Sequence, residues 1–157
     1  MYTFGHYIDY DERETLARIY TEDEVPLNVS LDAGSDMDLK AEEPCSAAFW
    51  SNDYEVSVYP SEEAYYQAAE QAAQMASIAM IPMGTFSPEQ QTAAILFSGI
   101  VREVERNPEP QEGMPLWRLR IETYAFHFDL YYYQDEPVAP GYVIHGQAWL
   151  YGKVTRA

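Results

Sequence analysis

The alternation of apolar and polar positions predicts that most of this chain forms β-strands. From Val25 to Leu31, the apolar residues Leu27, Val29 and Leu31 alternate with polar ones, a pattern typical of a strand with one buried face. Further runs of strand-forming residues lie between turn-forming ones, at residues 1–10 (a plausible edge strand), 47–50, 55–59, 77–86, 93–106, 116–133 and 142–155. The run 116–133 weakens near Tyr124 and Ala125, so both a hairpin and one bent strand fit it.

Two segments have the spacing of helices instead. In residues 11–20, Asp11 is an acceptable N-cap, and Leu16 lies at helical spacing from Ile19 or Tyr20. The longer segment begins with Ser61, a good N-cap, followed by two glutamates that complement the positive end of the helix dipole. We expect this helix to run to about residue 76.

Glycines inside two predicted strands, Gly99 and Gly146, indicate bulges or the corners of a barrel. The run Leu96-Phe-Ser-Gly-Ile-Val-Arg-Glu-Val104 resembles the coiled first strand of an OB-fold, and the resemblance covers roughly residues 77–157. It implies a small barrel, and for OB-folds the familiar activity is binding of single-stranded nucleic acid. We therefore expect an α+β fold, mostly antiparallel β, with a C-terminal OB-like or curved small barrel and one main helix near 61–76.

Charge divides the chain of 157 residues unevenly. Residues 1–91 hold 18 acidic and 3 basic side chains, whereas residues 92–157 hold 8 and 6, within a total of −17. This predicts an acidic N-terminal β-rich subdomain over 1–60 and a helix plus OB-like β domain over 61–157, or one continuous domain. The negative field repels nucleic-acid phosphates and anionic lipid, so nucleic acid is disfavoured, no membrane partner is expected, and a basic protein surface is favoured.

The single cysteine and the N-terminal sequence point to the cytoplasm. Cys45 has no partner for an internal disulfide, and the chain has neither a basic leader nor an apolar run long enough to cross a membrane. Glu42 and Glu43 beside Cys45 should raise the pKa of its thiol, which indicates a structural residue. The segment Asp32–Asp38 fails the ligand pattern of a calcium loop, and no phosphate-binding, dinucleotide, hydrolase or CxxC motif occurs. We expect no cofactor.

Alternation places a polar and aromatic set on the outer faces of two C-terminal strands. If these strands pair, the set forms one patch consisting of His127, Asp129, Tyr131, Tyr133, His145, Trp149 and Tyr151. Its two imidazoles and one carboxylate are an acceptable metal-ligand set or acid–base pair, although no ligand or nucleophile motif accompanies them. Exposed Tyr and Trp also suit a binding surface, and a face that is solvated or covered by another subunit remains the simplest interpretation.

Three functions follow from these features. The first is a non-catalytic cytoplasmic binding protein whose acidic face engages a basic protein partner. The alternative is a small-molecule-binding or hydrolytic enzyme that uses the histidine, aspartate and aromatic patch. The second alternative is binding of single-stranded nucleic acid by the OB-like part, which the total charge opposes. A homo-oligomer is compatible with each of them.

Overall fold

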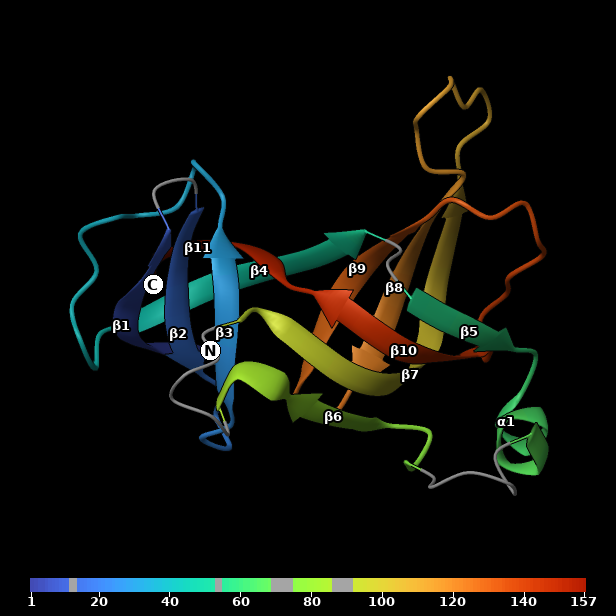
Figure 1. Cartoon of the computed structure of the whole chain (residues 1–157), viewed down its shortest axis with the longest axis horizontal. Coiled ribbons are helices and arrows are strands. Elements are labelled where there is room, and N and C mark those ends of the chain that lie inside the picture. The colour runs from blue at the N-terminus through green and yellow to red at the C-terminus, as the bar shows by residue number, and fades with distance from the viewer. Residues whose placement is uncertain (12–13, 53–54, 69–74, 86–91) are drawn as a thin grey trace. The chain divides into compact units, whose positions relative to one another are not determined.

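The computed structural model describes residues 1–11, 14–52, 55–68, 75–85 and 92–157, which form a mostly β fold with one short α-helix among them (Figure 1). The strands are β1 (Tyr2–Asp11), β2 (Glu14–Tyr20), β3 (Pro26–Leu31), β4 (Pro44–Asn52), β5 (Glu55–Tyr59), β6 (Ala79–Pro82), β7 (Ala94–Arg106), β8 (Trp117–Thr123), β9 (Phe126–Tyr132), β10 (Val143–Trp149) and β11 (Tyr151–Arg156). The helix is α1 (Glu62–Ala68), and a 3-10 turn, η2 (Met83–Thr85), follows β6.

The chain forms two compact units, each assembled from separated segments. Unit 1 comprises Met1–Trp50, Pro82–Ile95 and Trp149–Ala157, and unit 2 comprises Ser51–Ile81 and Leu96–Ala148. The chain therefore passes between the units four times, which differs from the predicted division at residue 60. The predicted division into 1–60 and 61–157, or one continuous domain, stays a prediction.

Unit 1 contains a closed ring of five strands in the order β1-β2-β3-β11-β4 (Figure 1). The ring closes because β1 pairs with β4 at Tyr2↔Cys45 as well as with β2, so β1 is not the edge strand that we expected. Pairing is antiparallel except between β11 and β3, which run parallel at Tyr151↔Ser30. The expected small barrel is confirmed at this coarse level. Of the range 77–157, only β11 belongs to the ring.

The burial of side chains in unit 1 explains why the prediction of a helix over residues 11–20 was wrong. These residues were predicted to be helical, but those that the structure describes belong to β1 and β2. Leu16, Ala17 and Ile19 are all fully buried, so both faces of β2 are covered and its alternation is lost. The spacing of Leu16 and Ile19 is then the pattern that the sequence shows, and residues at this spacing also lie on one face of a helix.

Unit 2 contains a sheet whose strands follow the order β9-β8-β7-β10-β5, with β6 paired to β7. The β9–β8, β8–β7 and β10–β5 pairs are antiparallel. The predicted break in 116–133 is a hairpin of β8 and β9, and Ala125 in its turn has a φ of 73°. The loop 107–116 joins β7 to β8 and projects beyond the ends of these strands (Figure 1). Gly99 and Gly146 both lie where a Cβ atom would collide with the neighbouring strand.

Helix α1 begins as predicted. The Ser61 hydroxyl accepts a hydrogen bond from the Ala64 amide at 3.0 Å, the geometry of an N-cap. The described helix ends at Ala68, and residues 75 and 76 are not helical; the part of the prediction over 69–74 lies outside the described residues. The fold is thus more nearly all-β than the expected α+β class.

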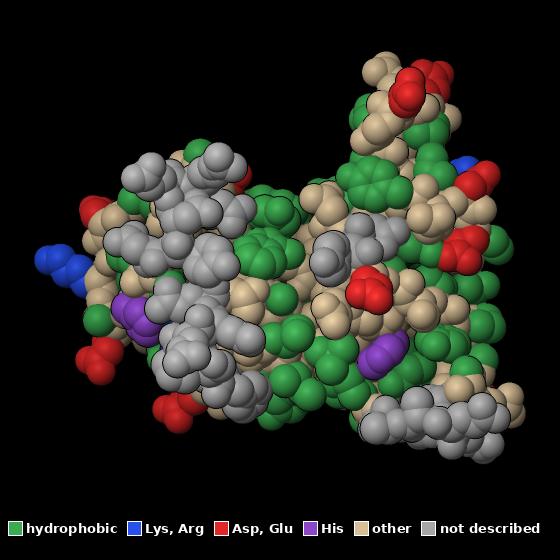
Figure 2. Space-filling model, in the orientation of Figure 1, with side chains coloured by type: hydrophobic (Ala, Val, Ile, Leu, Met, Phe, Trp, Pro, Cys, Tyr) green, Lys and Arg blue, Asp and Glu red, His purple; other side chains and the backbone are tan. Residues whose placement is uncertain are grey.

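The negative charge belongs to both units. Unit 1 has 13 acidic and 5 basic side chains, a balance of −8, and unit 2 has 13 and 4, a balance of −9. Figure 2 accordingly shows scattered carboxylates and few basic groups. The asymmetry along the sequence does not become an asymmetry between the units, because their segments are interleaved.

Candidate functional site

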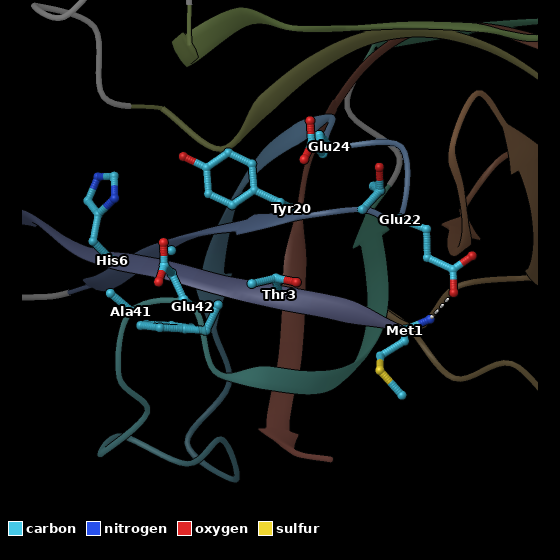
Figure 3. Close-up of a pocket in the computed structure, with 11 residues that line it drawn as sticks. Met1, Thr3, His6, Tyr20, Glu22, Glu24, Ala41 and Glu42 are labelled. Atoms are coloured by element: carbon cyan, nitrogen blue, oxygen red, sulfur yellow. Dashed lines mark hydrogen bonds and ion pairs between the residues drawn. The ribbon is translucent and has the colours of Figure 1, made fainter.

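The larger of two cavities described for this protein, about 740 Å³, lies in unit 1. It is bordered by the start of β1, the end of β2 with the turn after it, and the loop before β4 (Figure 3). Three carboxylates, Glu22, Glu24 and Glu42, line it together with the ring of Tyr20 and the imidazole of His6. The Met1 amino group pairs with Glu22 at 3.4 Å, where both groups are exposed, and the other two carboxylates have no ion pair or hydrogen bond with the described residues.

A bulge in β1 shapes the floor of this cavity. The pairing of β1 with β2 shifts between Phe4 and His6, so Gly5 is the extra residue. A Cβ atom at Gly5 would lie 2.7 Å from the Tyr20 ring and 2.8 Å from the Arg18 carbonyl oxygen. Gly5 therefore lets the Tyr20 ring lie close against the strand beside the carboxylates.

Two of the carboxylates are presented by turns in the left-handed region. Glu24 has a φ of 61° in the turn between β2 and β3, which is closed by a hydrogen bond from its amide to the Thr21 carbonyl. Glu42 has a φ of 67°, and its amide donates to the Phe4 carbonyl at 2.8 Å. Non-glycine residues rarely adopt this conformation, so backbone hydrogen bonds fix where these two side chains begin.

Most other carboxylates of the acidic loop 32–43 are engaged in holding the barrel together. Glu43 and Asp38 bind the Arg156 guanidinium, and Asp36 accepts from the Arg156 amide at 2.8 Å. The Glu43 hydrogen bond raises the pKa of Arg156, and Arg156 lowers the pKa of the Glu43 carboxyl. These carboxylates attach the loop to β11 and do not form an open acidic face.

The predicted patch is divided by the fold. Strands β9 and β10 do not pair, because β8 and β7 lie between them. His127, Asp129 and Tyr131 do share one face of β9, opposite the buried Phe126, Phe128 and Leu130. Asp129 lies 3.4 Å from Arg118 and 3.3 Å from Arg120, so its carboxylate is engaged across the β8–β9 pair.

The remaining patch residues lie elsewhere. Tyr133 donates to the Asn52 side chain at 3.2 Å, Trp149 packs against the buried Ile8, Leu16 and Ala93, and Tyr151 stacks on Trp50. Trp149 and Tyr151 belong to unit 1, whereas the other members belong to unit 2. The described residues contain no group of three His, Cys, Asp or Glu side chains arranged for a metal ion.

His145 has partners that the sequence did not reveal. Its Nδ1 lies 2.7 Å from the Ser98 hydroxyl, which lies 2.9 Å from the Tyr65 hydroxyl, and Tyr65 donates to the Met75 carbonyl at 2.8 Å. Ser98 is fully buried and Tyr65 is 2% exposed. Burial lowers the pKa of His145, although a hydrogen bond with the Phe97 backbone raises it in part. A single serine in an apolar strand gives no sequence signal from which this series of hydrogen bonds could have been predicted.

The arginines of unit 2 form ion pairs, and the cysteine is buried. Each of the four arginines in unit 2 pairs with a carboxylate: Arg102 with Glu122, Arg106 with Asp135, Arg118 with Glu105 and Asp129, and Arg120 with Asp129. They do not form the open basic stripe that nucleic-acid binding would require. Cys45 is fully buried, and burial, followed by the charge of Glu43, raises the pKa of its thiol.

Comparisons with models of protein families, with curated proteins and with solved structures gave no match. The fold defines a mostly β protein that contains a closed five-strand barrel. In the part of the chain that the structure describes, no helix is both long enough and apolar enough to cross a membrane.

Proposed function

We propose that this protein is a non-catalytic, cytoplasmic binding protein whose acidic barrel unit engages a basic protein surface. The cavity lined by Glu22, Glu24 and Glu42 carries the proposal, because it combines concavity with clustered carboxylates. An arginine or lysine side chain of the partner would enter it. Opposite charges also steer the two proteins together, so association should weaken as salt is added.

The composition of the cavity supports a cationic occupant. Glu24 and Glu42 have no ion pair with the described residues, whereas Asp38 and Glu43 nearby are already paired with Arg156. The Tyr20 ring adds a face over which a guanidinium or ammonium group gains roughly 0.5–1 kcal/mol at an exposed site. A cytoplasmic location fits a chain whose single cysteine is a buried thiol.

The test compares two double variants of equal net charge. E24Q/E42Q neutralises the cavity, and E109Q/E112Q neutralises two exposed glutamates in the 107–116 loop of unit 2. Binding of a fluorescent octa-arginine peptide is measured by anisotropy at 50 and 200 mM NaCl. We expect E24Q/E42Q to weaken binding at least tenfold and E109Q/E112Q at most twofold, with weaker binding of the unmodified protein at the higher salt.

Equal losses for the two variants would mean that the peptide responds only to net charge, and the cavity would lose its assigned role. Absence of binding to the unmodified protein at 50 mM NaCl would also overturn the proposal. Circular dichroism of each variant verifies that the fold is retained.

A further inference from the structure

The chain of hydroxyl groups beside His145 has only one consistent direction. A carbonyl oxygen can only accept, so the single proton of Tyr65 goes to Met75, and Tyr65 must accept from Ser98. The single proton of Ser98 is then used, and its oxygen must accept from Nδ1–H of His145. The Ser98 contact therefore assigns the ring proton of neutral His145 to Nδ1. The hydrogen bond with the Phe97 backbone must then share this same Nδ1–H, which leaves a lone pair on Nε2.

A second cavity, about 240 Å³, lies over the same ring in unit 2. Cα pairing of His145 with Ser57 and of Gln147 with Glu55 puts these four side chains on one face of the β10–β5 pair. All four line the cavity, whereas Ser98 is completely buried and does not. Because Nδ1 faces Ser98, the ring edge left for the cavity carries Nε2.

The cavity therefore offers acceptors and negative charge. The Glu55 carboxylate has no hydrogen bond or ion pair with any described residue, and no lysine or arginine borders the cavity. Val56 and Leu96 add apolar residues to the wall of the cavity. Gly146 lets β10 lie close against β5 beside the cavity, because a Cβ atom there would lie 2.0 Å from the Glu55 carbonyl oxygen.

We propose that this cavity binds a small molecule that carries a primary ammonium group, which donates to Nε2 of His145 and to the Glu55 carboxylate. An anion is disfavoured, because Glu55 would repel it and the neutral imidazole presents a lone pair. A metal ion would find only one imidazole and one carboxylate here, which is fewer strong ligands than a protein site ordinarily supplies. A cavity of about 240 Å³ limits the ligand to a small molecule.

The test uses benzylamine as the probe and benzyl alcohol as its uncharged counterpart. Long-range ¹H–¹⁵N correlation spectra at pH 7.5 report the tautomer of His145, and titration with each probe reports binding through the Nε2 shift. We expect the proton on Nδ1, a saturable Nε2 shift with benzylamine, and at least tenfold weaker binding of benzyl alcohol. The variant E55Q should weaken benzylamine binding at least tenfold, and the charge-matched E109Q should leave it within twofold.

Three results with the unmodified protein would overturn the proposal: a proton on Nε2 in the free protein, equal binding of amine and alcohol, or no shift of the His145 signals with benzylamine. Equal losses in E55Q and E109Q would do the same, by assigning binding to net charge. None of these bears on the octa-arginine experiment, which concerns a cavity in the other unit.

Discussion

Among the residues that the structure describes, some carboxylates join strands, whereas others have no ion pair with a described residue. Asp129 lies between two arginines and Glu43 binds Arg156, so each stabilises a pair of elements. Such pairs were invisible in the sequence, because their partners lie 9 to 113 residues away along the chain. Asp129, which suited a ligand in the sequence, pairs with two arginines. Glu24 and Glu42, which have no ion pair with the described residues, stood out in no motif.

His145 makes stability depend on pH near neutrality. Its pKa is below the ordinary 6.5 in the folded protein because of burial, so the unfolded chain takes up a proton first as pH falls. Stability is therefore fully present above pH 6.5 and decreases as pH falls from 6.5 toward the lower folded pKa. We expect the urea midpoint to decrease between pH 7.5 and 5.5, and this slope to be smaller in H145Q.

A matched exchange on β9, H127Q, should retain the slope, because His127 is exposed and takes no part in the Tyr65–Ser98–His145 chain. Measuring above pH 5.5 avoids a contribution to the slope from titration of the Glu43 carboxyl, whose pKa lies below 4.5. An unchanged slope in H145Q would assign the pH dependence to other groups.

At the level of elements, strands covered on one face were easier to predict than strands covered on both. The faces of β9 follow the predicted alternation, with Phe126 and Phe128 inside and His127 outside. β3 was correctly predicted to be a strand with Leu27 and Val29 buried, but its polar Asn28 and Ser30 are buried as well. β2, which is also covered on both faces, was mistaken for a helix. The predicted strand 142–155 is divided at Leu150, whose amide binds Ala93 and whose carbonyl binds Ser30. A change of the neighbouring strand at such a position does not alter the alternation of apolar and polar residues, so the sequence pattern does not reveal it.

Gly146 supports a prediction about the β10–β5 pair. In G146A, the new Cβ would meet backbone atoms of Glu55 and Val56, which cannot move without shifting β5. We expect a loss of about 1–3 kcal/mol in the free energy of unfolding, as for other overpacked sites, and faster amide exchange over β5. Urea titration and hydrogen exchange measure the two effects.

The control is G34A, where the new Cβ would meet only the flexible side chains of Asp32 and Lys153. We expect its free energy of unfolding to change by less than about 0.5 kcal/mol, as is usual for surface substitutions. Similar losses in both variants would indicate that the effect is not specific to the crowding at β5.

At the scale of the whole molecule, β11 decides whether the barrel can close. It lies between β3 and β4 and pairs with both, although more than 90 residues separate it from either along the chain. Local patterns could predict a barrel of strands, but not that its ring would combine both ends of the sequence.

We expect a chain that lacks residues 149–157 to lose the ordered barrel, because β3 and β4 would then have no strand between them. Loss of protected amides over residues 1–50, measured by hydrogen exchange, checks this. A variant with the 107–116 loop shortened should keep that protection, since no ring strand is altered. The isolated fragment 1–60 also lacks β11, so we expect it to have no protected amides. Protected amides in this fragment would contradict the role given to β11 and would support the subdomain predicted from the sequence.

The position of β11 also has a consequence for biosynthesis. During translation, β3 and β4 are completed long before residues 151–156 are added, so both wait with unpaired backbone groups. Exposed strand edges of this kind are templates for association with other chains. The nascent chain is thus exposed to association with other chains from the completion of β3 and β4 until β11 is added.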